Sequence, residues 1–264
     1  MGQIDDETAV RAVGDGSYAT RLSANWCIGN NPNGGYAVQP VLRALADVTG
    51  RPDPTSVTVH YLRPALGDAD ATITTAVVRA GRSGTNVTAT LIQDDEPRLA
   101  VAAIMGDLST PVSDAPDPGL AVVAPVIPPP EACMDRAELG QGIELPLLAR
   151  LDVRVRRDQP PDAAAMVDGW IRLRDRTPPA APWLVLFADA FPPAVHAKVA
   201  RVGWVPTLEL TAHVRRRPRD GWVQARMTCD DVAGGRMIET GSLWDSSGAL
   251  VARCRQLGML LSPR

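Results

Sequence analysis

Two patterns of apolar residues run along the chain, and each occurs twice. Residues 33–50, NGGYAVQPVLRALADVTG, carry apolar residues at helical spacing between an asparagine and a glycine, which predicts a helix with an N-cap and a stop signal. Residues 183–191, WLVLFADAF, are apolar except for Asp189 and follow a proline, a residue favoured at the start of a helix. This second helix is predicted to be buried on all sides and to end or kink at Pro192–Pro193.

Each predicted helix is followed by four strand-like segments. The first of them is VTVHYLRP (57–64) in one half and LTAHVRRRP (210–218) in the other, and the two match at a threonine, a histidine and a proline. The remaining segments are 72–81, 85–95 and 98–108, and then 222–231, 236–245 and 249–261. This repeat predicts an α+β fold in which a curved antiparallel sheet wraps each helix. We expect the two units to join edge to edge, because that removes exposed sheet edges.

A proline-rich stretch separates the two halves, with seven prolines between residues 109 and 142. The predicted organisation is an N-terminal unit at residues 1–110, an extended linker at 111–142 and a C-terminal unit at 143–264 that carries the candidate catalytic residues. Within the last unit, LARLDVRVRR (148–157) predicts a further strand.

Charge and composition exclude several classes of function. The 264 residues have a net charge of −3, whereas a nucleic-acid-binding protein usually carries a basic excess. No 18 apolar residues run together, so no membrane span is predicted, and the N-terminus lacks the regions of a signal peptide. Four widely spaced cysteines do not form metal-binding pairs, and we interpret them as small buried hydrophobic residues in a reducing, cytoplasmic compartment.

The chemistry of the chain has to be sought outside the common motifs, because GxSxG, HExxH, P-loop and GxGxxG patterns are absent. With only three histidines, the ligands for a hydrolytic metal site are too few and too scattered, and no feature supports a Ser-His-Asp triad. We therefore predict neither a metal nor an organic cofactor. The remaining candidate is Asp189, since an unpaired carboxylate in a buried helix is costly and marks a functional site.

Strand alternation supplies possible partners for Asp189. In residues 251–261 it places Gln256 on the small, apolar face that packs on the helix. In residues 207–214 it places Thr207 and Thr211 on the more polar face. A carboxylate, an amide and a hydroxyl that converge can hold and activate a water molecule. Two simpler readings are that Asp189 points outward near the helix end and that Gln256 is structural.

These segments resemble the acyl-CoA thioesterase II family of double-hotdog proteins over nearly the whole chain. In that family an aspartate on the second hotdog helix, a threonine on the next strand and a glutamine on the final strand hold the nucleophilic water. The matching residues here are Asp189, Thr207 and Gln256. Thr211 competes with Thr207, because the register near Glu209 needs a one-residue gap.

The resemblance implies hydrolysis of an acyl-CoA thioester to a free acid and CoA, by a protein that assembles as a homo-oligomer. Asn33, Gly34 and Gly35 are expected to offer N–H donors to the substrate, although these glycines would equally suit a simple turn into the helix. Two alternatives remain. One is a catalytically silent double hotdog that binds acyl-CoA, and the other is a hotdog hydratase or dehydratase that pairs Asp189 with His196.

Overall fold

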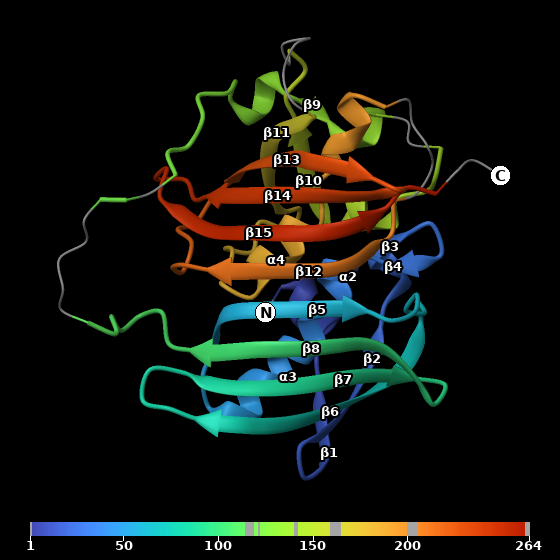
Figure 1. The fold of residues 1–264 in the computed structure, drawn as a ribbon, viewed down its shortest axis with the longest axis vertical. Helices are drawn as coiled ribbons and strands as arrows, with labels where there is room; N and C mark the ends of the chain where they lie inside the picture. The colour runs from blue at the N-terminus through green and yellow to red at the C-terminus, as the bar shows by residue number, and fades with distance from the viewer. Residues whose placement is uncertain are drawn as a thin grey trace.

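The computed structural model describes residues 2–113, 119–120, 122–139, 142–158, 165–199 and 205–261, and Figure 1 shows two stacked halves that share one sheet. Among these residues, thirteen strands follow one another in the antiparallel order β1-β2-β6-β7-β8-β5-β12-β15-β14-β13-β11-β10-β9. A separate hairpin is formed by β3 (Cys27–Ile28) and β4 (Asn31–Pro32). The strands of the N-terminal half are β1 (Arg11–Gly14), β2 (Ser17–Leu22), β5 (Asp53–Tyr61), β6 (Ala69–Ala80), β7 (Thr85–Gln93) and β8 (Glu96–Gly106).

Among the described residues, the C-terminal half supplies the other seven strands and four of the short 3-10 helices. Its strands are β9 (Met134–Asp135), β10 (Leu151–Val155), β11 (Met166–Leu173), β12 (Thr207–Val214), β13 (Val223–Ala233), β14 (Arg236–Trp244) and β15 (Leu250–Met259). The 3-10 helices in the described part of the chain are η1 (Ala24–Trp26), η2 (Pro130–Ala132), η3 (Arg136–Leu139), η4 (Pro146–Ala149) and η5 (Ala194–Ala197).

The two halves join where β5 pairs with β12. Thr58 stands directly opposite Thr211 in this ladder, and these are the residues that the sequence repeat matches. Edge-to-edge pairing is therefore confirmed, together with the predicted α+β double hotdog. Both joining strands lie in the interior of the sheet, so neither leaves an unpaired edge there.

The helices lie where the apolar periodicity predicts them, except that the first is divided and the second ends at Ala188, three residues before the end of its predicted range. The first predicted helix is divided into α2 (Gly34–Ala37) and α3 (Gln39–Thr49), which meet at Val38. Gly50 ends α3 in the left-handed region with φ of 63°, a conformation that glycine adopts without a steric penalty. The second helix is α4 (Trp183–Ala188), and all six of its residues are buried.

Several strands precede the helices, and the sequence pattern predicts only one of them. β1 and β2 come before α2, and β10 and β11 come before α4; β10 is the strand expected within residues 148–157. β1 is exposed at every position, so it has no apolar alternation to detect. Part of the predicted linker (114–118, 121, 140 and 141) lies outside the described residues. Its described part contains β9, which pairs with β10, and the proposed unit boundaries stay a prediction.

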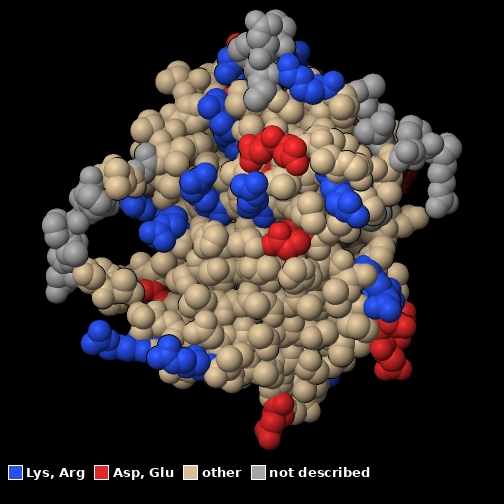
Figure 2. Space-filling model, viewed as in Figure 1, with Lys and Arg blue, Asp and Glu red and all other residues tan. Residues whose placement is uncertain are grey.

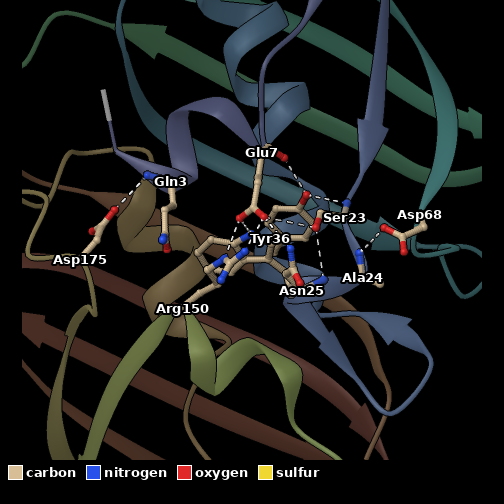
Figure 3. Close-up of polar contacts among 10 residues, drawn as sticks. Gln3, Glu7, Ser23, Ala24, Asn25, Tyr36, Asp68, Arg150 and Asp175 are labelled. Carbon is tan, nitrogen blue, oxygen red and sulfur yellow. Dashed lines mark hydrogen bonds and ion pairs between the residues drawn. The ribbon is translucent and has the colours of Figure 1, made fainter.

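A buried ion pair ties the N-terminal segment to the C-terminal half. Glu7, just after α1 (Gln3–Asp6), accepts hydrogen bonds from Arg150 Nε and Nη2 at 2.8 and 2.7 Å, and both side chains are about four-fifths buried. The same carboxylate accepts from Trp26 Nε1 at 2.8 Å and from Asn25 Nδ2 at 2.7 Å, and Figure 3 shows Asn25 and Arg150 beside Glu7. The Tyr36 hydroxyl donates to the Glu7 carbonyl oxygen at 2.7 Å. Glu7 thus connects α2, η1 and the C-terminal half.

Charged side chains are unevenly distributed over the face of the sheet that Figure 2 shows. In Figure 2 charged side chains gather over the C-terminal strands, while the N-terminal part of the sheet turns a largely uncharged face outward; exposed residues there include Thr74, Thr88, Ala102 and Ile104. Among the described residues, no helix is long and apolar enough to cross a membrane. All four cysteines are unpaired and buried, as expected for small hydrophobic residues.

Candidate active site

A cavity of about 340 Å³ opens beside the junction of the two halves. It is lined by residues of α2, β5, α4, η5, β12, β14 and β15, so both halves contribute to its wall. Much of that wall is apolar, and two carboxylates, those of Asp189 and Glu239, line it among the polar groups. A mostly apolar cavity with a few converging polar groups is the usual form of a small-molecule site.

Asp189 is held by residues from the other half of the chain. It is the C-cap residue of α4, and its Oδ2 accepts hydrogen bonds from Asn33 Nδ2 at 2.7 Å and from the Gly35 N–H at 2.9 Å. Asn33 also donates to the Asp189 carbonyl oxygen at 3.0 Å. The carboxylate therefore points into the cavity, and the reading that it faces outward from the helix end does not hold.

Gly35 allows α2 to approach α4 closely enough for these bonds. A Cβ atom at this position would lie 2.8 Å from Leu186 Cα and 2.9 Å from the Val185 carbonyl oxygen. Such distances are shorter than real Cβ atoms tolerate, and the neighbours are backbone atoms that cannot move independently. Glycine at position 35 is therefore a requirement of the helix–helix contact that positions Asp189.

The environment of Asp189 raises the pKa of its carboxyl group to about 6. Burial is the main cause, because an ionised carboxylate loses hydration there. The Gly35 N–H, the Thr207 hydroxyl, the Arg136 guanidinium and the Asn33 amide oppose the shift. The cavity leaves the residue itself partly accessible. A carboxylate with a pKa near 6 in such a site can accept a proton at neutral pH and return it.

A β-bulge brings Thr207 to Asp189. Strict alternation would group Thr207 with Glu209 on one face of β12, but Thr207 pairs with Gly258 while Glu209 pairs with the adjacent Leu257. This extra residue turns Thr207 toward the cavity, where its Oγ1 lies 3.4 Å from Asp189 Oδ1 and 3.5 Å from Gln256 Oε1. Both distances are long for direct hydrogen bonds.

Gln256 reaches the site from the core face of β15, as predicted. Ala252, Cys254 and Gly258 are buried on that same face. The Gln256 Nε2 donates to Glu239 Oε1 at 2.8 Å, which leaves its Oε1 toward Thr207. The expected acid, hydroxyl and amide are thus adjacent in space, although they come from three separate segments of the chain.

Glu239 is a second buried carboxylate that the sequence analysis missed. Besides Gln256, it accepts a hydrogen bond from the Ala194 N–H at 2.6 Å through its other oxygen. Burial raises the pKa of its carboxyl group to about 7, with a contribution from the negative charge of Asp189. The sequence does contain an indication of Glu239. Alternation along β14 places it on the same face as Met237 and Leu243, where it is the only charged residue.

Arg136 and Tyr61 are two further side chains at the cavity that the pattern did not indicate. Arg136 is 2% exposed and donates to the Ala190 carbonyl oxygen, and burial lowers the pKa of its guanidinium to about 10. Tyr61 is the last residue of β5 and lies against α2. Neither residue stands out in the sequence, since Arg136 lies in the proline-rich stretch and Tyr61 follows the ordinary alternation of a strand.

The remaining predicted residues divide between the cavity and the outer face of the sheet. Asn33 and Gly34 line the cavity, whereas the Gly35 N–H is directed at Asp189. Thr211 lies on the other face of β12 from Leu210 and Ala212 and bonds to Thr58 and Glu209. His196, in η5, lines the cavity. The Asp189 carboxylate accepts hydrogen bonds from Asn33 and Gly35, and the Thr207 hydroxyl lies 3.4 Å from it.

No group of three or more histidine, cysteine, aspartate or glutamate side chains among the described residues is placed to hold a metal ion. The polar side chains that line the cavity are the carboxylates of Asp189 and Glu239, the amides of Asn31, Asn33 and Gln256, the hydroxyls of Tyr61 and Thr207, the guanidinium groups of Arg63 and Arg136, and the imidazole of His196. Such a set suits the activation of water by a general base.

Two family models together match most of the chain. Residues 22–106 match the model of the acyl-CoA thioesterase N-terminal domain, and residues 125–260 match that of the acyl-CoA thioesterase C-terminal domain. A crystal structure of a thioesterase II candidate from Thermobifida fusca is 30% identical, with a TM-score of 0.85 over 99% of this chain and 98% of that one.

Two other relatives have no described function. A hotdog-fold protein of unknown function from Alicyclobacillus acidocaldarius is 24% identical, with a TM-score of 0.86 and full coverage of both chains. An uncharacterized protein of Mycobacterium tuberculosis is 27% identical over 92% of this chain and 90% of its own length. The first of these supports the fold alone.

Proposed function

Because the chain belongs to the acyl-CoA thioesterase II family, we propose that it hydrolyses an acyl-CoA thioester to a free acid and CoA. The observation that carries this proposal is Asp189, a carboxylate with a raised pKa that faces an apolar cavity. It lies within reach of a hydroxyl and an amide oxygen, Thr207 Oγ1 and Gln256 Oε1. The closeness of these three side chains supports the catalytic roles that the family resemblance implies for them.

In the proposed reaction, Asp189 accepts a proton from a water molecule as the water oxygen attacks the thioester carbonyl carbon. The long distances from Thr207 to its two neighbours leave room for hydrogen bonds to that water. Collapse of the tetrahedral intermediate breaks the carbon–sulfur bond, and the sulfur takes the proton back from Asp189. The products are one carboxylic acid and one free CoA thiol, so atoms and charge balance.

Glu239 supports the orientation of Gln256 in this mechanism. Its two carboxylate oxygens accept from two different donors, the Gln256 amide and the Ala194 N–H. With the Gln256 nitrogen bound in this way, the Gln256 oxygen faces Thr207 and can accept a hydrogen bond from the water. Glu239 is thus a positioning residue, since it acts through Gln256.

The cavity wall suits an acyl chain. Ile28, Ala37, Val205 and Met259 are among the apolar residues that line it, and aliphatic surface of this kind favours hydrocarbon over a polar substrate. Asn33 and Gly34 are proposed to contact the substrate near the reacting carbon, because they line the cavity beside Asp189. Gly35 is proposed to act through the carboxylate that it binds.

The test is CoA release from a panel of short, medium and long acyl-CoAs by the wild type and by Asp189→Asn. Removing the base should lower kcat by about 100-fold or more while retaining the fold. Asp70→Asn, at an exposed residue that pairs with Arg21, is the control and should behave as the wild type. Undiminished activity in Asp189→Asn would refute the mechanism. Binding of acyl-CoA without release by the wild type would favour the silent-binder alternative.

A further inference from the structure

Tyr61 carries a buried hydroxyl without a hydrogen-bond partner among the described residues. The residue ends β5 on the same side as Val57 and Val59, which are buried, and it lines the cavity together with Asp189. Burying a hydroxyl without a partner is unfavourable. A buried hydroxyl without a partner at a candidate site therefore indicates that an atom of the bound ligand supplies the missing hydrogen bond.

The two other tyrosines of the chain show the contrast. Tyr18 donates to Asp47 at 2.7 Å, and Tyr36 donates to the Glu7 carbonyl oxygen at 2.7 Å. Buried tyrosine hydroxyls normally find such partners. Tyr61 differs from both in facing the cavity.

Thioester hydrolysis also lacks an assigned donor for the carbonyl oxygen, which becomes an oxyanion in the transition state. Of the four N–H groups of α2 (Gly34–Ala37), three are already engaged, so only that of Gly34 is left for the oxyanion beside the Tyr61 hydroxyl. Gly35 N–H donates to Asp189, Tyr36 N–H to Asn33 Oδ1, and Ala37 N–H to the Asn33 carbonyl oxygen.

Gly34 places the Tyr61 ring beside the catalytic carboxylate. A Cβ atom at position 34 would lie 2.8 Å from the Cε1, Cζ and hydroxyl oxygen of Tyr61, so the end of the ring rests directly against the glycine backbone. The residues on either side of Gly34 are Asn33 and Gly35, which both bind Asp189. The free hydroxyl and the proposed base are therefore positioned by one three-residue segment.

We propose that Tyr61 is a further catalytic residue, whose hydroxyl donates a hydrogen bond to the carbonyl oxygen of the bound thioester. The bond strengthens as the carbonyl oxygen gains negative charge during attack by water, and it weakens when the carbon–sulfur bond breaks. This inference rests on the proposed thioesterase function. Burial, together with the negative charges of Asp189 and Glu209, raises the pKa of the Tyr61 hydroxyl well above its usual value, so Tyr61 keeps its proton at neutral pH.

The test compares Tyr61→Phe with Tyr18→Phe in the full-length protein, measuring kcat, KM and the unfolding midpoint. Tyr61→Phe should lose about 100-fold in kcat, with KM changed much less, and should unfold at the wild-type temperature or above because it removes an unpaired buried hydroxyl. Tyr18→Phe loses a satisfied hydrogen bond away from the cavity. Its unfolding midpoint should fall while its kcat stays at the wild-type value.

The outcomes separate this inference from the proposed function. If the wild type hydrolyses thioesters in an Asp189-dependent way and Tyr61→Phe matches its kcat, Tyr61 is not the oxyanion donor and the thioesterase assignment stands. A lowered unfolding midpoint with unchanged kcat would show that the hydroxyl has a structural partner instead. Failure of the wild type to hydrolyse any member of the panel would overturn the function and this inference together.

Discussion

Thr58 and Thr211 face each other across the junction of the two halves, with their hydroxyl oxygens 2.9 Å apart. They occupy matching positions in the repeat, so each half contributes a threonine to the junction. Thr211 also donates to Glu209. The hydroxyl of Thr211 is thus engaged on the outer face of the sheet, whereas that of Thr207 points at the cavity.

This arrangement predicts different effects for two matched substitutions. Thr207→Val keeps the shape of the side chain and removes its hydroxyl from the proposed water site, so kcat should fall by about 10-fold to 100-fold. Thr211→Val should leave kcat within about twofold of the wild type and should lower the free energy of unfolding by about 1 kcal/mol. Steady-state kinetics and thermal unfolding of both variants provide the check, and a reversed pattern would transfer the catalytic role to Thr211.

The rate of hydrolysis should increase with pH through about 6. Asp189 must be ionised to accept the proton of the water, and burial raises its pKa to about 6. At lower pH the carboxyl group is protonated and cannot act as the base. A profile of kcat/KM from pH 4.5 to 8.5 measures this limb. A rate independent of pH across that range would exclude Asp189 as the titrating base.

Stability should change with pH in the opposite direction. The folded-state pKa values of Asp189 and Glu239, about 6 and about 7, lie above those of unfolded chains. A carboxyl group with a raised pKa contributes stability that is complete below its unfolded pKa and is lost as pH rises through the folded value. The unfolding midpoint should therefore fall between about pH 4 and pH 7.

The variant Glu239→Gln distinguishes the contribution of Glu239 from that of Asp189. The substitution removes one titration, so stability should depend less steeply on pH between about 5 and 7. It also replaces one of two acceptor oxygens by an amide nitrogen, which cannot accept from either the Gln256 amide or the Ala194 N–H. Gln256 would lose its fixed orientation, and kcat should fall about 10-fold or more. If Glu239 were only a packing residue, kcat at pH 8 would match the wild-type value.

Gly35→Ala should disrupt the site through the backbone. The added Cβ would press on Leu186 and Val185 of α4, which forces α2 away from Asp189. Both the unfolding midpoint and kcat should decrease, with a free-energy cost of about 1–3 kcal/mol typical of overpacking. Gly14→Ala is the matched control, because nothing lies within 4 Å of a Cβ at that position. Equal behaviour of the two variants would contradict the close approach of the helices.

Glu7→Gln should lower stability without altering the chemistry. The Glu7–Arg150 pair is about four-fifths buried, and loss of its charge-assisted hydrogen bonds should cost about 1–3 kcal/mol. Denaturant unfolding measures this loss against Asp70→Asn, which breaks an exposed ion pair and should have little effect. Because Glu7 lies away from the cavity, kcat of the folded variant should equal that of the wild type.

The pattern of apolar residues predicted most of the fold because burial imposes a period on helices and strands. The eight strand-like segments after the two helices correspond to β5–β8 and β12–β15. Gly50 ends α3 as expected, whereas α4 ends at Ala188, four residues before Pro192. β1 was missed because an exposed strand has no such period. Asp189 and Gln256 were indicated for the same reason, as lone polar residues on apolar faces.

The sequence by itself indicated the repeat, the helices, the main strands and two of the four proposed catalytic residues, Asp189 and Gln256, since each of these depends on local periodicity. Only the tertiary structure decided what surrounds Asp189. Asn33 and Gly35 are more than 150 residues away along the chain, and no local pattern encodes a contact of that range. The choice of Thr207 depended on a bulge that reverses strand alternation, and the orphan hydroxyl of Tyr61 emerges only when every neighbouring donor and acceptor has a position.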